Sequence, residues 1–521
     1  MSDAIEVYDT TLRDGGQALG VNLSLADKLA VARCLDKLGV AYIEGGWPGS
    51  NQKDAAFFRD VRTLGLKHTK IAAFGSTRHR SKRPEEDDNL RALVESAADV
   101  CCIFGKAWDL HVKEALRVTL ADNLEMVRSS VAFLAQQTAK PVFFDAEHFF
   151  DGFADDSEYA LEVVTAAHQA GAARVILCET NGGALPDQVA DAVRKVLQRV
   201  PGVKLGIHVH NDGGLAVANT LAAVQAGAVQ VQGTINGIGE RCGNVDLTTV
   251  IANLELKLGR RCLPDGNLSM LAETSRRVWD QLNLVAPLNQ PFVGESAFAH
   301  KGGVHVSAMQ RNRRTYEHIR PEAVGNERRI LVSEMSGRSN LVAKLSNRYP
   351  KLRDSDAVPK ILDEVQQREN EGYSFESADA SLDLIVRRHL NEWQPAFELD
   401  HYRVYGLGGN NAERAVEATV KLQVAGDLRL CVAEGTGPVD ALSHALLLAL
   451  RPAFPTLNEL QLVDFRVRVV NVKDGASAKV RVVVEHRIGR ERFTTLGVHQ
   501  NIIEASWLAL VDAAEYALHS T

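Results

Sequence analysis

Two histidines separated by a single residue are the feature of this sequence best suited to hold a metal. His208 and His210 stand at the predicted end of a buried strand, directly before the polar segment 211–214. Successive side chains of a strand alternate between its two faces, so both imidazoles point one way and Val209 points the other. Two imidazoles and one carboxylate make a three-ligand face that leaves open positions on a divalent cation, and we select Asp14 as the carboxylate. An H-x-H pair by itself is weak evidence of a metal site, so its place in the fold decides its weight.

A second chemical feature is the arginine beside that aspartate. On an ordinary surface, Arg13 and Asp14 would form an ion pair of little energetic value. On a loop at the mouth of a barrel, Arg13 would instead offer a fixed positive charge to a carboxylate or to a developing oxyanion.

The residues up to about 258 alternate between short apolar runs and longer helical stretches, eight times over. The predicted strands are 5–8, 42–45, 70–74, 100–104, 142–146, 174–178, 206–209 and 230–235, and helices such as 25–38, 123–136, 157–170 and 215–225 fit between them. Eight βα units in about 250 residues are typical of an α/β (β/α)8 TIM barrel. The alternative is an open doubly wound sheet, which usually has a Gly-rich phosphate loop after its first strand. This chain has the polar and charged segment Thr10–Gly16 there, so we favour the barrel.

A barrel of this kind places its function at the C-terminal ends of its strands. Polar residues gather at those ends and not at the opposite ones: Arg13, Asp14, Glu44, Asp145, Glu147, Glu179, Thr180, His208, His210 and the segment 236–244. Glu44 and Glu179 are explained equally well as structural acids of the mouth, so we leave both out of the catalytic set.

Two further parts follow the barrel. The residues from about 275 to 395 have a helical, loop-rich pattern with dense mixed charge. Beyond them the predicted order is strands 415–424 and 429–434 with helix 439–450, then strands 461–470, 479–485 and 492–498 with helix 502–517. The recurring order predicts an α+β domain with an internal duplication. We therefore expect a barrel over residues 1–274, a helical linker over 275–395 and a C-terminal α+β domain over 396–521.

The composition excludes several classes of protein. A formal charge of −7 on 521 residues gives no electrostatic reason to expect nucleic acid or an anionic membrane as partner. The N-terminus has no apolar segment of the secretory type, and the longest apolar runs fall far short of a membrane span. Seven cysteines form no C-x-x-C pair, which favours core thiols in a reducing compartment. We therefore expect a cytoplasmic protein.

Three motifs together resemble the acyltransferase branch of the DRE-type TIM-barrel metalloenzymes, which contains the isopropylmalate, homocitrate and citramalate synthases. These motifs are Asp9–Gln17, His208–Asp212 and Asn236–Asn244. The resemblance covers nearly the whole chain. It implies a divalent cation, which we leave open among Zn, Mg and Mn. The implied metal ligands are Asp14, His208, His210 and, at or near the metal, Asn244.

The reaction implied by the resemblance joins acetyl-CoA to a small 2-oxo acid. Arg13 would stabilise the alkoxide formed on the acid, and Thr180 matches a residue that binds the substrate carboxylate. Removal of a proton from the acetyl methyl group needs a base, for which Glu147 and His305 are both candidates. The family pattern also implies that the segment around His305, together with Tyr316, reaches the active site of the partner subunit in a homodimer.

One departure from the family pattern concerns that segment. Many relatives carry an acid two residues after the histidine that matches His305, where this chain has Ser307. The departure bears on the acid–base relay and not on the metal site. For His148 and His300 we favour packed or solvated roles.

Within the family, the chain looks most like the citramalate synthase subgroup, on the segments 44–51, 74–77 and 316–319. This implies pyruvate as the 2-oxo acid and citramalate as the product, within isoleucine biosynthesis. A bulky Phe74 or Trp47 beside the substrate would shrink the pocket toward a methyl group. Such contacts discriminate each methylene by only about 1–3 kcal/mol, so some cross-reactivity is expected.

The C-terminal part resembles the regulatory domain of these synthases, which binds an end-product amino acid. Isoleucine is the allosteric inhibitor expected if citramalate is the product. The Gly-rich turn 434–441 would expose backbone N–H groups at a helix start, which suits a carboxylate. A plain helix N-cap explains the same turn equally well.

Three other functions remain open. A 2-isopropylmalate or homocitrate synthase would use a larger 2-oxo acid. A metal-dependent C–C lyase or aldolase shares the barrel motifs but usually lacks a domain like 396–521. A non-catalytic metabolite sensor would retain the fold without the reaction, which the intact Arg13, Asp14, His208 and His210 argue against.

Overall fold

Eight parallel strands close into a barrel in strict sequence order. The computed structural model describes residues 4–332, 338–406, 416–470, 478–489 and 491–520. The barrel strands are β1 (Glu6–Asp9), β2 (Tyr42–Gly46), β3 (Lys70–Ser76), β4 (Val100–Lys106), β5 (Val142–Glu147), β6 (Arg174–Glu179), β7 (Leu205–Val209) and β8 (Gln230–Gly233). The predicted TIM barrel is therefore confirmed.

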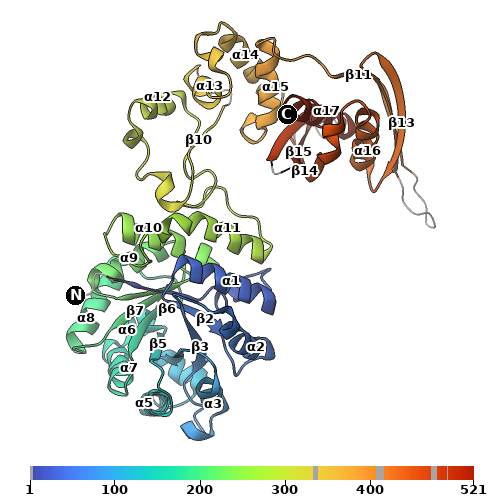
Figure 1. The fold of residues 1–521 in the computed structure, drawn as a ribbon. Helices are drawn as coiled ribbons and strands as arrows, with labels where there is room; N and C mark the ends of the chain where they lie inside the picture. Colours follow the sequence, from blue (N-terminus) through green and yellow to red (C-terminus); the bar gives the residue numbers. More distant parts are fainter. Residues whose placement is uncertain (1–3, 333–337, 407–415, 471–477, 490, 521) are drawn as a thin grey trace. The chain divides into compact units, whose positions relative to one another are not determined.

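Helices surround the strands on the outside of the barrel (Figure 1). They are α1 (Leu25–Leu38), α2 (Gln52–Asp60), α3 (Asp88–Glu95), α4 (Asp109–His111), α5 (Leu120–Gln137), α6 (Phe149–Asp155), α7 (Ser157–Gln169), α8 (Pro186–Arg199), α9 (Ala216–Ala226), α10 (Leu247–Leu256) and α11 (Leu271–Leu282). Local signals set their ends. In α1, Ser24 and Asp27 form a capping box, and Gly39 ends the helix at a φ of 90°.

Six of the barrel strands run one or two residues beyond their predicted ends, and the ends of β7 and β8 matter most for the site. β7 ends at Val209, as predicted, and His210 directly after it forms an isolated antiparallel bridge with Asn244. We expected strand eight to reach Ile235, but β8 ends at Gly233 and Ile235–Gly237 form a short 3-10 turn. The loop after β8 thus folds back over the end of β7.

By its backbone contacts the chain divides into two units. The first comprises the residues up to Phe298 with His318–Arg328, and the second comprises Ala299–Glu317 with the residues from Arg329 onward. In the described residues of the second unit, a two-stranded parallel sheet and four α-helices precede the C-terminal domain. These elements are β9 (Ala299–His300), α12 (Gly303–Arg311), β10 (Arg329–Ile330), α13 (Arg338–Leu345), α14 (Ala357–Asn370) and α15 (Asp379–His389).

The C-terminal domain contains the same fold pattern twice. Each copy is a three-stranded antiparallel sheet followed by a helix that packs on its second and third strands. The copies are β11 (Phe397–Gly406), β12 (Val416–Val424), β13 (Asp427–Gly435) and α16 (Pro438–Leu450), then β14 (Gln461–Val469), β15 (Val480–Ile488), β16 (Glu491–His499) and α17 (Ile502–Ser520). The duplicated α+β domain is confirmed. The predicted strand start at Ala415 lies outside the described residues.

The prediction missed β11, the first strand of the first copy. Its register against β12 shifts between Leu399 and His401, and a bulge of this kind breaks the two-residue alternation that marks a strand. Only Phe397 in this strand is buried, so the sequence carries little apolar signal there.

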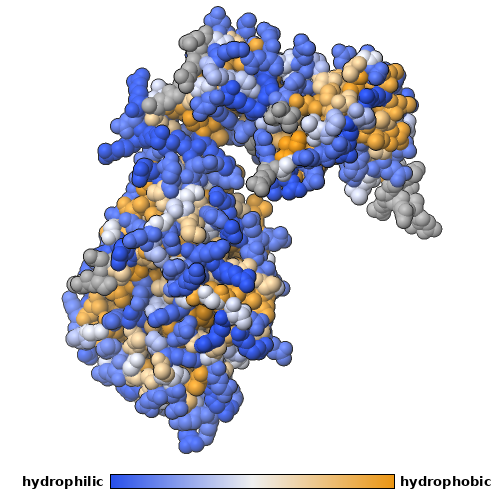
Figure 2. Space-filling view, viewed as in Figure 1, coloured by the Kyte–Doolittle hydropathy of each residue, from blue (hydrophilic) through white to orange (hydrophobic). Residues whose placement is uncertain are grey.

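One face of each C-terminal sheet lies against its helix, and the other carries exposed apolar side chains. Figure 2 shows hydrophobic residues gathered over β11 and β13. The exposed apolar side chains of the two sheets are Leu399, Tyr405, Leu428, Leu430, Val432, Leu462, Val463, Val467 and Val469. Among the described residues, no helix combines the length and the apolar character needed to cross a membrane.

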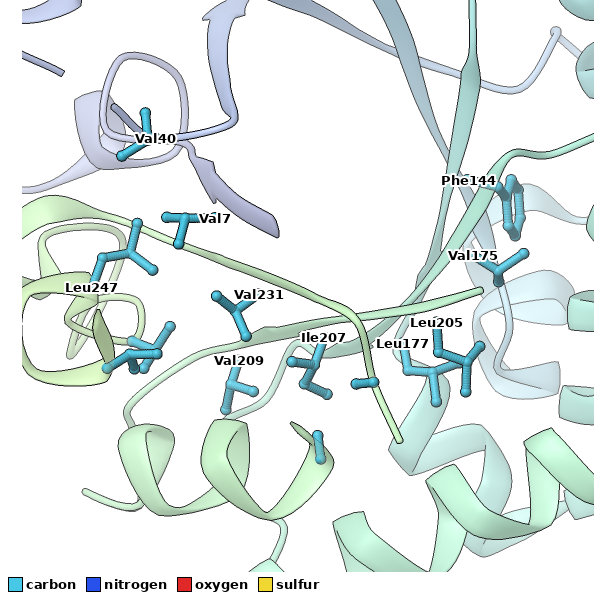
Figure 3. Packing of buried hydrophobic residues seen from close by; sticks show 14 of the residues in the cluster. Val7, Val40, Phe144, Val175, Leu177, Leu205, Ile207, Val209, Val231 and Leu247 are labelled. Atoms are coloured by element: carbon cyan, nitrogen blue, oxygen red, sulfur yellow. The ribbon is translucent and has the colours of Figure 1, made fainter. Parts of the chain in front are cut away.

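The core of the barrel follows the alternation of side chains along each strand. Outward-facing residues pack under the helices and are fully buried, including Val7, Val175, Leu177, Leu205, Ile207, Val209 and Val231 (Figure 3). Burial of each such side chain stabilises the fold by about 1.5–3 kcal/mol. A separate cluster of aromatic and small side chains contains Tyr8, Phe74, Phe143 and Ile176. Since Val209 faces the helices, His208 before it points into the barrel.

Candidate active site

Three of the four predicted metal ligands come together at the mouth of the barrel. Asp14, His208 and His210 each offer one ligand atom, and these atoms lie within 4.8 Å of one another. All three side chains are buried. Nε2 of His208 lies 3.3 Å from Oδ2 of Asp14. The turn after β1 holds Asp14, whose backbone N–H donates to the carbonyl of Thr10 at 2.9 Å.

The polar atoms around these ligands fit a divalent cation. Nδ1 of His208 lies 3.1 Å from Oε1 of Gln232. Because an amide oxygen can only accept a hydrogen bond, the imidazole proton lies on Nδ1, and Nε2 is left to bind a metal. Nδ1 of His210 and Oδ1 of Asn244 are buried, and neither has a hydrogen-bond partner in the part of the chain that the structure describes. Buried polar atoms normally have partners, so these two atoms mark a place for a bound group.

The electrostatics favour the ligand forms of Asp14 and His210, whereas at His208 burial is outweighed by Asp14, which raises the pKa of this imidazole. Burial opposes ionisation of Asp14, but Arg13 and the hydrogen bond with His208 outweigh it and hold the pKa of this carboxyl far below its usual value. Burial and the neighbouring His208 lower the pKa of His210 to about 4. Asp14 is therefore ionised and His210 is neutral near pH 7, which are the forms that coordinate a cation.

Arg13 is held in place by a second carboxylate. Its Nε donates to Oε2 of Glu44 at 2.7 Å, and the guanidinium carbon lies 3.8 Å from the centre of the Phe74 ring. Glu44 is fully buried at the end of β2 and also accepts hydrogen bonds from the hydroxyls of Tyr8 and Thr10. Glu44 is thus a positioning residue for Arg13.

A cavity of about 270 Å³ opens at this mouth, and most of the predicted site residues line it. One wall is aromatic: Trp47 meets Phe74 and Phe104 edge to face at 5.7 and 5.9 Å, and Phe74 stacks on Phe104 at 5.5 Å. The lining comprises Arg13, Asp14, Gln17, Trp47, Phe74, Phe104, Asp145, Glu147, Cys178, Thr180, His208, His210, Glu240 and Arg241. The cavity therefore has a charged, metal-ligating side and an apolar side.

Thr180 and Glu147 lie on the wall opposite β1. The backbone N–H of His148 donates to Oγ1 of Thr180 at 3.0 Å, so the Thr180 proton remains available to another acceptor. His148 has a left-handed backbone with φ of 57°, and its ring packs against His111 with Nδ1 3.1 Å from Asp151, as expected for a packed histidine. Glu147 forms an ion pair with Lys106 at the end of β4.

His305 and Tyr316 lie in the second unit, where their rings stack with centroids 4.1 Å apart. His300 in the same unit lies beside Glu317, with Nε2 3.5 Å from a carboxylate oxygen. The structure groups His305 with Tyr316.

Lys106 and Gln232 were not among the residues predicted at the mouth, whereas Glu44 and Asp145 were predicted to lie there but were given no role in the site. Burial raises the pKa of Asp145 to about 6, and the nearby Glu44 adds to the shift. Gln232 lies directly across from His208 in the β7–β8 register, so the inward alternation of β8 is a signal that could have found it. Glu147 and Lys106 are paired in the same way between β4 and β5.

The closed barrel with a possible metal site at its mouth defines the class, and comparison with known proteins agrees. Residues 4–278 match the HMGL-like family. Residues 292–372 match the homocitrate synthase post-HMGL domain-like family, and residues 376–518 match the LeuA allosteric (dimerisation) domain. The molecule is thus a (β/α)8-barrel enzyme of the HMGL-like type.

Curated relatives narrow this class. The chain is 48% identical over 520 residues to the (R)-citramalate synthase of Aquifex aeolicus, covering 99% of this chain and 98% of that one. It is 46% identical over 519 residues to that of Geobacter sulfurreducens, with coverage of 99% and 98%. It is 48% identical over 526 residues to that of Synechocystis sp., with coverage of 98% and 96%. The chain therefore belongs to the citramalate synthase family and is an acyltransferase-type enzyme.

Proposed function

We propose that this protein condenses acetyl-CoA with pyruvate and water to give (R)-citramalate and CoA. The observation that carries this proposal is the 46–48% identity, over almost the whole chain, to three relatives named (R)-citramalate synthase. The charged and apolar sides of the mouth cavity suit a small 2-oxo acid.

Asp14, His208, His210 and Asn244 would hold a divalent cation, Zn, Mg or Mn. When bound, that cation polarises the keto group of the 2-oxo acid as a Lewis acid. Arg13, fixed by Glu44, offers its charge to the oxygen that becomes an alkoxide when the keto carbon is attacked. The Thr180 hydroxyl donates to the substrate carboxylate, because its own oxygen already accepts from His148.

The carbon nucleophile forms when the acetyl methyl group loses a proton. Glu147 lines the mouth cavity and is our candidate for the base, with Lys106 holding its carboxylate. His305 and Tyr316, stacked on each other in the second unit, are the candidates for a further acid–base role from the partner subunit. After the C–C bond forms, water cleaves the thioester and CoA leaves.

The aromatic wall is the proposed reason for choosing pyruvate. The Arg13 guanidinium lies over the face of the Phe74 ring, and the ring packs against Trp47 and Phe104. The Phe74 ring therefore cannot move aside without displacing Arg13. A rigid wall beside the keto carbon leaves room for a methyl group and disfavours an isopropyl group.

The direct test is product identification by mass after incubation with acetyl-CoA and a mixture of pyruvate, 2-oxoisovalerate and 2-oxoglutarate. We expect citramalate as the main product, with release of free thiol. A preference for 2-oxoisovalerate would overturn the choice of substrate. Absence of any thiol release with each acid, under metal, would overturn the condensation itself.

We also propose a homodimer formed through the C-terminal domain. Residues 376–518 match a domain described as allosteric and dimerising, and its sheets carry exposed apolar side chains on the faces away from their helices. A patch of this kind on a soluble surface usually marks an interface.

Isoleucine is the proposed inhibitor, and it would act through the same C-terminal domain. This places the enzyme, by proposal, in isoleucine biosynthesis. The turn before α16 is a less open carboxylate site than its sequence suggested, because Asp440 already accepts from the backbone N–H of Thr436 at 2.8 Å. The domain match is therefore the support for this proposal. Unchanged activity across millimolar isoleucine would refute the regulatory proposal alone.

A further inference from the structure

A second and larger cavity adjoins the mouth cavity on the β3–β4 side of the barrel. Its volume is about 600 Å³, against about 270 Å³ for the mouth. Trp47 and Phe104 line both cavities, so these two side chains form the boundary between them. The site described above uses only the smaller space.

The larger cavity has an excess of positive charge. Arg78, Arg80 and Arg117 line it, and none of them forms an ion pair with a carboxylate of the described residues. Asp87 is the acid among the lining residues. It is buried, and its oxygens accept from the backbone N–H groups of His79, Asn89 and Leu90. Asp87 is therefore committed to capping α3 and to holding the loop before it.

Two of these arginines are already oriented by the fold. Nε of Arg78 donates to Oγ of Ser129 at 2.9 Å, and one terminal nitrogen of Arg78 donates to the carbonyl of Lys82 at 3.0 Å. Arg80 donates to the carbonyls of Leu116 and Arg117, both at 3.1 Å. These bonds use neutral acceptors, which leave the guanidinium charges uncompensated. Arginine binds phosphate oxygens through paired N–H donors, so the cavity suits a multiply phosphorylated ligand.

An ion pair also connects the linings of the two cavities. Lys106 lines the larger cavity, and its partner Glu147 lines the mouth. A ligand that occupies both spaces would place its phosphorylated end by the arginines and its reactive end by Glu147. Trp47, Leu116 and Met126 add apolar surface along the larger space.

We propose that the larger cavity binds the nucleotide end of acetyl-CoA, with Arg78, Arg80 and Arg117 as its phosphate contacts. CoA joins a phosphorylated adenosine to a long pantetheine arm that ends in the thiol. The mouth cavity accommodates the acetyl thioester and the 2-oxo acid, so the nucleotide must lie outside it. This inference rests on the proposed function for the identity of the ligand, whereas the cavity and its charge stand by themselves.

The test is titration calorimetry of the full chain with adenosine 3′,5′-bisphosphate, which is the nucleotide end without the arm and the second 5′-phosphate. The variant is Arg80→Gln/Arg117→Gln, and the matched control is Arg194→Gln/Arg199→Gln on the exposed side of α8. We expect wild type and control to bind alike and the variant to bind at least tenfold more weakly. Since Arg80 also holds the 116–117 backbone, Arg117→Gln alone is the second variant, because this side chain makes no hydrogen bond to a described residue.

A kinetic measurement separates loss of phosphate contacts from a general defect. The ratio of kcat/KM for acetyl-CoA over acetyl-pantetheine should fall at least tenfold in the double variant and stay constant in the control. Equal binding in all proteins, no binding by wild type, or an unchanged ratio would overturn the inference. Binding of the bisphosphate requires no reaction, so a protein that binds it in this way yet never consumes pyruvate would refute the proposed function and support the cavity assignment.

Discussion

Arg13 depends on a carboxylate that has no predicted contact with substrate. Glu44 accepts from Tyr8, Thr10 and Arg13 in a fully buried position, and the bond to Arg13 Nε is 2.7 Å long. The neighbouring Phe74 ring supports the guanidinium from the other side. The position of one charge thus depends on side chains from three separate strands.

Replacing Glu44 with Gln should therefore impair catalysis through Arg13. The isosteric amide removes the charge that orients the guanidinium, and a misplacement of about 1 Å can cost roughly 10²-fold in rate. We expect kcat/KM for pyruvate to fall by about that factor in steady-state assays. The control is Glu6→Gln, which disrupts a Glu–Arg pair with Arg174 at the other end of the barrel. Wild-type turnover by the Glu44 variant would contradict the positioning role.

The ligand triad makes a separate prediction about metal removal. Protein dialysed against a chelator should lose activity and regain it with one of Zn, Mg or Mn. A cation that binds only the folded state at about 100 times its Kd stabilises the protein by roughly 2.7 kcal/mol. We therefore expect added cation to raise the Tm of the stripped wild type and to leave that of His210→Ala unchanged. Full activity of the stripped protein would exclude a metal role.

At the scale of elements, the register between neighbouring strands places the groups that tune each ligand. His208 on β7 pairs across the sheet with Gln232 on β8, and the amide oxygen lies 3.1 Å from Nδ1. A hydrogen bond of this kind holds the ring orientation and the tautomer of a metal-binding histidine.

Replacing Gln232 with Leu should weaken metal binding while every ligand remains. Loss of such a partner typically lowers metal affinity by about 10–100-fold. Competition with a chromophoric chelator would measure it. Gln232→Glu retains an acceptor oxygen for the Nδ1 proton and should restore most of the affinity. Equal affinities for wild type and the Leu variant would show that Gln232 does not hold the ring.

At the scale of the whole molecule, the exposed face of the C-terminal sheets should control association. Leu430 and Val432 on β13 are 62% and 49% exposed, so replacing both with Asp leaves the fold of one chain unstrained. Two charges in an apolar interface should shift the dimer to monomer in sedimentation velocity. Val285→Asp, at a residue 95% exposed after α11, is the control and should leave the sedimentation coefficient unchanged. A double variant that still sediments as a dimer would place the interface elsewhere.

The local sequence pattern predicts the fold correctly where the alternation of apolar and polar residues is strong. The barrel strands, to within one or two residues at their ends, follow from buried runs separated by capped helices, as in α1 with its Ser24 and Asp27 box. β11 escaped because a bulge breaks its alternation and because only one of its side chains is buried. The bridge between His210 and Asn244 was not predicted, because the fold-back of the loop after β8 has no local signature.

The sequence also predicts which polar side chains lie at the C-terminal ends of the strands. In a parallel barrel every C-terminal strand end reaches the same rim, so Asp14, His208 and His210 could be grouped from their positions alone. The amino-acid order thus determines the eight-fold repeat, the rim on which the polar residues gather and the identity of the candidate ligands. Closure of the barrel decided the rest: that Glu44 holds Arg13, that Lys106 pairs with Glu147, and that a basic cavity adjoins the mouth. These contacts join residues on different strands and loops, and their geometry depends on strand stagger and packing that no local sequence pattern records.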